Sequence, residues 1–268
     1  MRPLSLTERR LAAPSVSLAD LLSGERPAIE GHATVRLDSY ATEIVASGFP
    51  GLRPLPDRIR RAQLRGYVDQ VVDRDFPEAG RKVRRPDTLR RWMAAYAAAT
   101  STTATFETIG DAATSGHGDK PAKTTVQPYR DILERLHLID ELPAWTPSNN
   151  HIHNLGASPK HHLADPALAT TILGIDVDAL LTGADSAVHI PRDGSFLGAL
   201  FESLVTLSVR VYAQASEAHT KHFRIHGGDK EVDRIGGDLL DAAVITTGEH
   251  AYRRTDGIAV IPTALLGP

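Results

Sequence analysis

The chain has 268 residues, 41% of them hydrophobic, a formal net charge of −3 and no cysteine. That length can hold two modest domains, and the absence of cysteine excludes disulfides and thiolate metal or redox sites. No apolar run approaches the ~18 residues of a membrane span, and the first residues lack the apolar core of a signal peptide, so we expect a cytoplasmic protein.

Residues 1–31 contain too few apolar side chains for a core of their own, and we expect them to form a tail. Apolar residues at helical spacing then predict a series of helices along the chain. These helices cover residues 38–46, 58–75, 88–100, 105–113, 124–136, 165–173, 176–181 and 196–213.

Two of these helices, with the polar turn between them, predict a helix-turn-helix unit over residues 105–145. Thr105 is a suitable N-cap for the first helix. In the second, Thr124 and Gln127 have the spacing of a capping box, which places Pro128 in the first turn. The second helix has one apolar face and basic residues off that face, as a DNA-recognition helix requires. The alternative is a two-helix corner that only packs, since this turn is longer than that of simple helix-turn-helix proteins.

The periodicity changes after this unit. Short alternating runs, broken by prolines, predict the strands of a wing over residues 139–145, 150–155 and 160–163. Residues 184–194 have the composition of a linker between domains. Further strand-like runs follow at residues 221–225, 231–235, 242–246 and 258–261.

Positive charge is concentrated in residues 57–91, which hold eleven Arg and Lys against six acids. A local basic surface can hold a phosphate backbone even when the whole chain is acidic, although such a segment can also be a solvated helix face. The candidate phosphate contacts in this segment and on the recognition helix are Arg58, Arg60, Arg61, Arg65, Arg84, Arg85, Lys123, Arg130 and Arg135.

Several local patterns coincide along the chain. They are Gly48-Phe49-Pro50, Asp73-Arg74-Asp75, Ser158–Pro166, Gly198–Glu202 and Arg224–Asp233. Together they resemble a large prokaryotic family of predicted AAA-type ATP-binding proteins. The resemblance implies the C-terminal region of that family, a domain of unknown function with a winged helix followed by a restriction-endonuclease-like part.

The chain departs from this family at the ATP site. The Leu-Ser-x-x-Glu pattern at Leu4–Glu8 marks the end of the ATPase domain in the family, so residues 1–31 would be a remnant of that domain. No GxxxxGK[ST] motif is present, and Gly118–Thr124 has a proline where backbone N–H groups must cradle phosphate. We therefore expect neither ATP nor another cofactor.

The chain departs from the family at the nuclease-like site as well. Glu202 and Asp233 match the first acidic positions of that site and are weak catalytic candidates. The Glu-x-Lys that should follow is missing, and no lysine occurs after Lys230, whereas a metal-dependent nuclease needs both. We expect no metal site at this place. Four histidines near the wing are interpreted as structural or surface residues rather than ligands: His151, His153, His161 and His162.

The sequence and the resemblance together predict an α+β fold in three parts. Residues 1–31 are the tail left from an ATPase domain, 32–183 a helical and winged-helix domain, and 184–268 a truncated restriction-endonuclease-like domain. The preferred function is a non-catalytic nucleic-acid- or protein-binding remnant of the ATPase family. Two alternatives are a metal-dependent nuclease that uses Glu202 and Asp233, and a purely structural protein-interaction module. The expected partners are duplex DNA, or a protein or second copy on surface normally covered by the ATPase domain; no membrane is expected.

Overall fold

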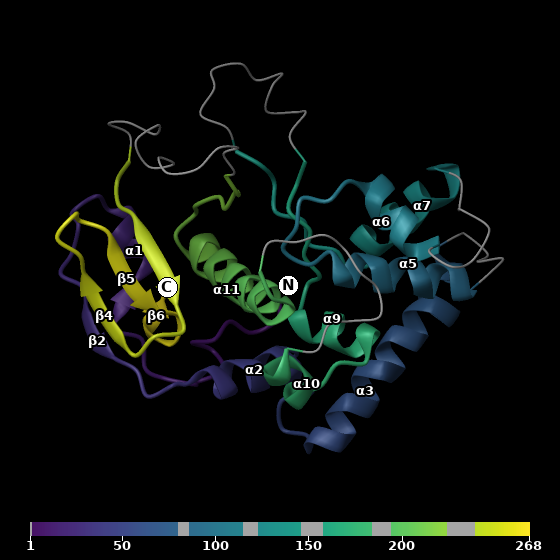
Figure 1. Cartoon of the computed structure of the whole chain (residues 1–268), viewed down its shortest axis with the longest axis horizontal. Helices are drawn as coiled ribbons and strands as arrows, with labels where there is room; N and C mark the ends of the chain where they lie inside the picture. The colour runs from purple at the N-terminus through teal and green to yellow at the C-terminus, as the bar shows by residue number, and fades with distance from the viewer. Residues whose placement is uncertain (1, 80–85, 115–122, 146–157, 184–193, 224–238) are drawn as a thin grey trace. The chain divides into compact units, whose positions relative to one another are not determined.

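The computed structural model describes residues 2–79, 86–114, 123–145, 158–183, 194–223 and 239–268, with the side chains of 123–126 left out (Figure 1). These residues form two compact units that each combine separate stretches of the chain. The first unit comprises Ala41–Leu142 and Lys160–Ser203. The second comprises Arg2–Tyr40, Pro143–Pro159 and Leu204–Pro268. The division predicted at residues 31 and 183 stays a prediction.

The fold is mixed α+β, as predicted, and helices hold most of its regular structure. Within the described residues the helices are α1 (Leu18–Leu22), α2 (Leu37–Ala46), α3 (Asp57–Gln70), α4 (Phe76–Glu78), α5 (Pro86–Ala98), α6 (Phe106–Thr114), α7 (Lys123–Arg135), α9 (Pro166–Leu173), α10 (Val177–Thr182) and α11 (Phe196–Ala215). The helix predicted over 58–75 is α3 continued by one π-helical turn, Val71–Asp75. This turn leads directly into α4, where Pro77 lies in the first turn, a position that tolerates the missing N–H.

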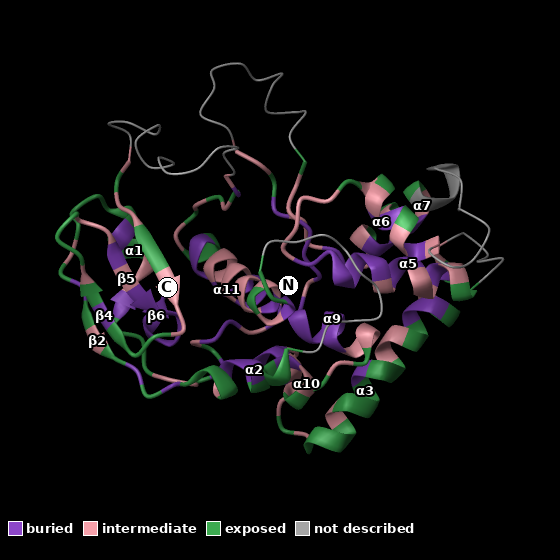
Figure 2. Ribbon diagram, in the orientation of Figure 1, coloured by how far each residue is buried: buried purple, intermediate pink, exposed green. Residues whose placement is uncertain are grey.

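The core of the first unit is built around α5, which packs against α6 and α9. Trp92 and Tyr96 are fully buried and stack with ring centroids 5.4 Å apart. Tyr129 of α7 meets Trp92 edge-on, so α7 is held against the same aromatic cluster. Figure 2 shows the contrast between buried α5 and the exposed outer side of α3. The first unit therefore presents α3 to solvent on a firmly packed support.

The two helices predicted around residues 105–145 are present as α6 and α7. Thr105 caps α6, since its hydroxyl accepts the Thr108 N–H at 3.1 Å. The turn at residues 115–122 lies outside the described part. Helix α7 begins at Lys123, so Pro128 lies inside it rather than in its first turn and removes one helical hydrogen bond.

After α7 the chain forms isolated antiparallel bridges, Ile139 with Leu163 and Leu142 with Lys160, where wing strands were predicted. These bridges pair the first and third of the predicted wing runs. The middle run, residues 150–155, lies outside the described residues. Helix α6, helix α7 and an antiparallel pair of extended segments therefore follow one another along the chain.

Asp165 joins two of the motifs that the sequence singles out. Its fully buried carboxylate accepts hydrogen bonds from the Ser47 hydroxyl at 2.7 Å and the Gly48 N–H at 2.6 Å. The other carboxylate oxygen accepts the Ala167 N–H at 2.9 Å, which caps α9. One side chain thus holds both the end of α2 and the start of α9.

The second unit contains two small sheets. The four-stranded sheet has the order β2 (Glu30–His32), β4 (His250–Arg253), β5 (Ala259–Pro262) and β3 (Ala243–Thr246). Strand β1 (Val16–Ser17) pairs in parallel with β6 (Leu266–Gly267). Strands β3 and β5 confirm the runs predicted at 242–246 and 258–261. The run at 231–235 lies outside the described residues.

The N-terminal residues, predicted to be a tail, are part of the interior of the second unit. Leu6, Val16 and Ile29 are buried, and the Leu6 N–H donates to the Ser208 hydroxyl of α11 at 3.2 Å. Their apolar residues are too few for a separate core but sufficient to complete one with α11 and the C-terminal strands. The pairing of β1 with β6 joins opposite ends of the chain, which sequence periodicity does not reveal.

An ion pair links Arg253, the last residue of β4, to Asp241, which lies just before β3. Arg253 donates to both carboxylate oxygens of Asp241, at 2.8 and 2.9 Å, and to the carbonyls of Pro27 and Gly257. The hydrogen bond from Arg253 lowers the pKa of Asp241 below its ordinary value. The folded state therefore favours the ionised carboxylate.

Replacing Arg253 with Met should lower the free energy of unfolding by about 2–3 kcal/mol at pH 7, because the Asp241 carboxylate, only 5% exposed, loses its partner. Since the folded pKa is depressed, this stabilisation is present above the unfolded-state value of about 3.9 and is lost as the pH falls through the folded pKa. Urea unfolding at pH 7 and pH 3 should show the difference between wild type and variant shrinking in acid. Arg254→Met is the matched control: its ion pair with Asp256 is about half exposed and should contribute less than ~1 kcal/mol.

Helix α11 is, among the described residues, the one helix long and apolar enough to cross a membrane. Less than half of its most apolar window is buried within the protein, and core helices of water-soluble proteins meet the same criterion. The helix also carries Glu202 and Arg210. Its composition is therefore weak evidence for a membrane span.

Candidate nucleic-acid interface

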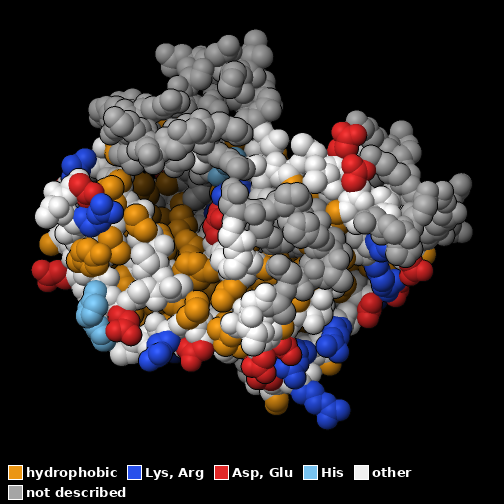
Figure 3. Space-filling view, viewed as in Figure 1, with side chains coloured by type: hydrophobic (Ala, Val, Ile, Leu, Met, Phe, Trp, Pro, Cys, Tyr) orange, Lys and Arg blue, Asp and Glu red, His pale blue; other side chains and the backbone are white. Residues whose placement is uncertain are grey.

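Three arginines project from one exposed face of α3. Arg58, Arg61 and Arg65 are separated by three and then four residues, so they share one side of the helix. All three are exposed, and within the described residues none of them forms an ion pair or hydrogen bond. Figure 3 shows basic side chains gathered near one end of α3, with acidic side chains beside them.

The acids of α3 are neutralised by other arginines. Asp57, at the start of the helix, pairs with Arg60. Asp69, near its end, pairs with Arg90 of α5 at 3.0 Å, and Arg90 also pairs with Asp73 at 3.2 Å. These contacts leave the positive charge of Arg58, Arg61 and Arg65 in surplus.

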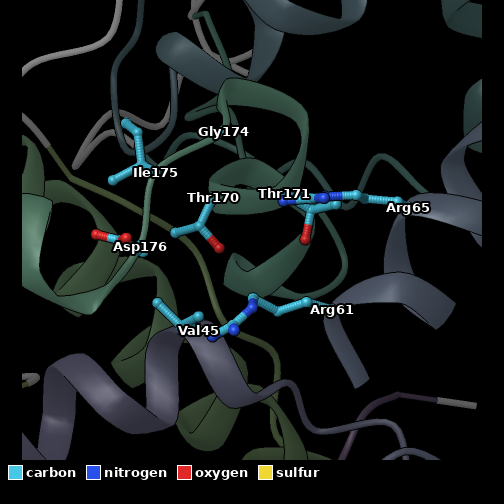
Figure 4. Close-up of a pocket in the computed structure, with 8 residues that line it drawn as sticks. All are labelled: Val45, Arg61, Arg65, Thr170, Thr171, Gly174, Ile175 and Asp176. Atoms are coloured by element: carbon cyan, nitrogen blue, oxygen red, sulfur yellow. The ribbon is translucent and has the colours of Figure 1, made fainter. Parts of the chain in front are cut away.

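Two of these arginines line a cavity of about 280 Å³ in the first unit. Figure 4 shows Arg61 and Arg65 extending from α3 into it, opposite the end of α9. The lining residues are Val45, Arg61, Arg65, Thr170, Thr171, Gly174, Ile175 and Asp176.

The end of α9 and Asp176 line this cavity together with Arg61 and Arg65. Gly174 ends the helix in the left-handed conformation, with φ 69°, and its N–H bonds back to the carbonyls of the last turn. A helix C-terminus carries partial negative charge and attracts cations. Since each guanidinium has five N–H donors, donors remain for an oxygen-rich ligand such as phosphate.

Other predicted phosphate contacts are engaged within the protein. Arg130 donates to Glu134 at 2.6 Å and to Glu141 at 3.1 Å, and its guanidinium lies 4.5 Å from the centre of the Phe106 ring. Burial alone would lower the pKa of Arg130, but the hydrogen bond to Glu134 and the charge of Glu141 raise it. Arg130 therefore secures α7 against its neighbours, and Arg60 is held by Asp57.

The remaining candidates are only partly described. Arg135, in the last turn of α7, is exposed and forms no ion pair with the residues that the structure describes. Lys123 begins α7, but its side chain lies outside the description, as do Arg84 and Arg85. Of the candidate contacts, the structure thus brings together Arg58, Arg61 and Arg65.

Of the two nuclease-like candidates, the described residues include one, Glu202. The Glu202 carboxylate forms an ion pair with Lys160 Nζ at 2.5 Å, and Asp233 lies outside the described part of the chain. His161 Nε2 lies 2.7 Å from the Ala104 carbonyl oxygen, and His162 Nδ1 lies 3.2 Å from the Ser203 hydroxyl. Both histidines are buried and hydrogen-bonded. His151 and His153 lie outside the description.

A second basic cavity, of about 230 Å³, lies within the second unit. It is lined by Arg2, Pro143, Arg210, Gln214, Ala218, His219, Thr220 and Lys221. Burial and the charge of Arg210 lower the pKa of Arg2 to about 10. No local sequence pattern indicates this cavity, because its basic residues come from three separate segments.

The part of the chain that includes the α3 cavity matches a protein family. Residues 37–179 match the family described as Domain of unknown function (DUF8612). The comparison with curated proteins found no match, and neither did the comparison with solved structures. All the residues that line the α3 cavity fall inside the matched region, which covers just over half of the chain. The chain therefore belongs to the family of the domain of unknown function DUF8612.

Proposed function

We propose that this protein binds duplex nucleic acid through Arg58, Arg61 and Arg65 of α3 and catalyses no reaction on it. The observation that carries this proposal is the set of three exposed arginines on one helix face with no acidic partner among the described residues. At a rise of 1.5 Å per residue, Arg58 and Arg65 are about 10 Å apart along α3. A duplex presents about three phosphates per strand over that length.

The proposed interaction is electrostatic and independent of sequence. Arginine guanidinium groups bind phosphate oxygens in a bidentate manner, which fixes the protein on the backbone without reading bases. The chain as a whole is acidic, with net charge −3, so contact with a polyanion requires a local basic surface such as this face. We expect weak binding with strong salt dependence.

The resemblance to AAA-type ATP-binding proteins supports a more detailed fold proposal. We infer that α6, α7 and the antiparallel bridges after them correspond to a winged helix. The order of these elements along the chain supports this proposal. On the same resemblance, the region after residue 183 corresponds to a truncated restriction-endonuclease-like part.

Fluorescence anisotropy with a labelled duplex of about 20 base pairs tests the binding proposal. With roughly three phosphate contacts, log K should fall against log salt with a slope of about −3, and binding should be strongest near ~50 mM salt. Absence of binding at that salt concentration would refute the proposal. The same duplex incubated with Mg²⁺ or Mn²⁺ should stay intact, since Glu202 is engaged by Lys160; cleavage that is lost in Asp233→Ala would establish the nuclease alternative instead.

One observation favours a protein-interaction role as the second candidate. Tyr252, Val260 and Val244 lie in register across β4, β5 and β3, and both Tyr252 and Val244 are nearly half exposed. An apolar row on an open sheet face is typical of contact surfaces. Self-association in light scattering, abolished by Val244→Asp, together with no duplex binding, would favour this candidate.

A further inference from the structure

We infer that His32, His250 and Glu249 of the second unit form a binding site for a transition-metal ion of the zinc type. One ligand atom of each residue lies within 4.8 Å of those of the other two. His32 Nε2 is 4.0 Å from a Glu249 carboxylate oxygen, and the two imidazole ring centroids are 4.8 Å apart. None of these three residues belongs to α3 or to the set proposed to bind duplex nucleic acid.

Strand pairing brings the two histidines together. Strands β2 and β4 are antiparallel, and His32 lies directly opposite His250 in their register. Side chains in such a pair start from Cβ atoms only about 4.5–5.5 Å apart on the same face of the sheet. The convergence is therefore set by the backbone of the sheet.

The bend before β4 supplies the third ligand. In a continuous strand, Glu249 would point to the face opposite His250. Residues 247–249 instead form a bend, and the Glu249 carbonyl accepts the Ala33 N–H at 2.7 Å at the end of the ladder. The carboxylate consequently lies on the same side as the histidines.

The backbone under the site is held in place. The Ser15 hydroxyl donates to the Glu30 carbonyl at 3.0 Å, and a Cβ at Gly31 would lie only 2.4 Å from that hydroxyl oxygen. Gly31 has φ 155°, a conformation that side chains rarely adopt. Strand β2 is thus fixed closely against the preceding segment, with His32 at its end.

The ligand set decides the class of metal. Two imidazoles and one carboxylate are ligands for Zn²⁺, which binds nitrogen at about 2.0–2.1 Å and leaves a fourth position for water in open sites. Mg²⁺ and Ca²⁺ prefer sites made only of oxygen. Tetrahedral ligands at that bond length are about 3.3 Å apart, so the ligand atoms, now within 4.8 Å of one another, must close in by up to about 1.5 Å. They are free to do so, because the His32 and Glu249 side chains are 52% and 54% exposed.

Isothermal titration of the full, untagged chain with ZnCl₂, in metal-free buffer with excess Mg²⁺, tests the inference. His32→Ala and His250→Ala should each weaken one Zn²⁺ site at least about tenfold, and Glu249→Gln should weaken it less. The exposed His219→Ala is the control within the same unit and should change nothing. Because the sequence contains 12 histidines, Zn²⁺ binding to the wild type does not by itself identify the site, whereas the variants do.

Two results would overturn the site. One is the absence of Zn²⁺ binding to the wild type at about 100 µM, a concentration at which even a weak site with ~10 µM affinity is filled. The other is unchanged binding in the double variant His32→Ala/His250→Ala. Circular dichroism of that variant guards against misfolding, and Co²⁺ absorption of Glu249→Gln gives a readout in a chain that retains both imidazoles. A wild-type Co²⁺ spectrum without a tetrahedral band would equally contradict the geometry.

Discussion

Replacing Asp165 with Ala should lower the free energy of unfolding of the first unit by about 3–5 kcal/mol, a large part of the ~5–15 kcal/mol typical of a folded protein. The carboxylate is fully buried and accepts three hydrogen bonds, from Ser47, Gly48 and Ala167. Its removal leaves three donors without an acceptor, two of them backbone N–H groups, and removes the N-cap of α9. Asp165→Asn should be destabilising as well, because its NH₂ group would face one or more of these donors.

Urea unfolding followed by tryptophan fluorescence measures the effect on the first unit. The chain has two tryptophans, Trp92 in the first unit and Trp145 in the second. In a Trp145→Phe background, the signal of buried Trp92 reports the first unit alone, and the midpoint should fall by ~1–2 M urea. Asp176→Ala is the matched control: this exposed N-cap of α10 accepts one bond, from Ala179 at 2.9 Å, and its loss should cost about 1 kcal/mol. Equal losses in the two variants would show that the buried network adds nothing.

Asp165 also illustrates how far the sequence determines the fold. The sequence identifies it as the start of a helix, because an N-cap and a proline after it act locally. The sequence likewise identifies the break at Gly48. It does not show that the two motifs touch, since the Gly48 N–H and the Asp165 carboxylate are 117 residues apart. Helices that depend on local periodicity were predictable; the pairing of β1 with β6 and of β2 with β4 was not.

In the candidate interface, too, sequence patterns identify the segment but not the contacts of each side chain. Counting charges identifies the basic segment and includes Arg58, Arg60 and Arg61 on equal terms. The i,i+3 spacing of Asp57 and Arg60 allows an ion pair, and the structure shows that this pair forms. Arg130 matches the pattern of a recognition helix, yet Glu141 reaches it from the extended segment after α7. Whether an arginine is free therefore depends on local pairs, such as Asp57 with Arg60, and on contacts that sequence spacing does not reveal, such as Glu141 with Arg130.

Changing Arg58, Arg61 and Arg65 together to Ala should weaken duplex binding about 10- to 100-fold near ~50 mM salt. Each lost phosphate contact reduces the salt slope by about 0.9, so the slope should approach zero in the triple variant. The corresponding triple Lys variant keeps the charge but not the bidentate guanidinium, and should keep most of the slope with weaker binding. Anisotropy titrations at several salt concentrations measure both quantities.

Arg60→Ala is the control that separates a specific face from general charge. It removes the same charge from the same helix, but its guanidinium is held by Asp57, so affinity should change less than about twofold. Arg135→Ala tests the competing interface, because Arg135 is the exposed arginine in the last turn of α7. If α3 is the interface, Arg135→Ala leaves the salt slope nearly unchanged. If instead Arg135→Ala abolishes binding and the α3 triple variant does not, the duplex lies on α7, as the helix-turn-helix pattern of the sequence predicts.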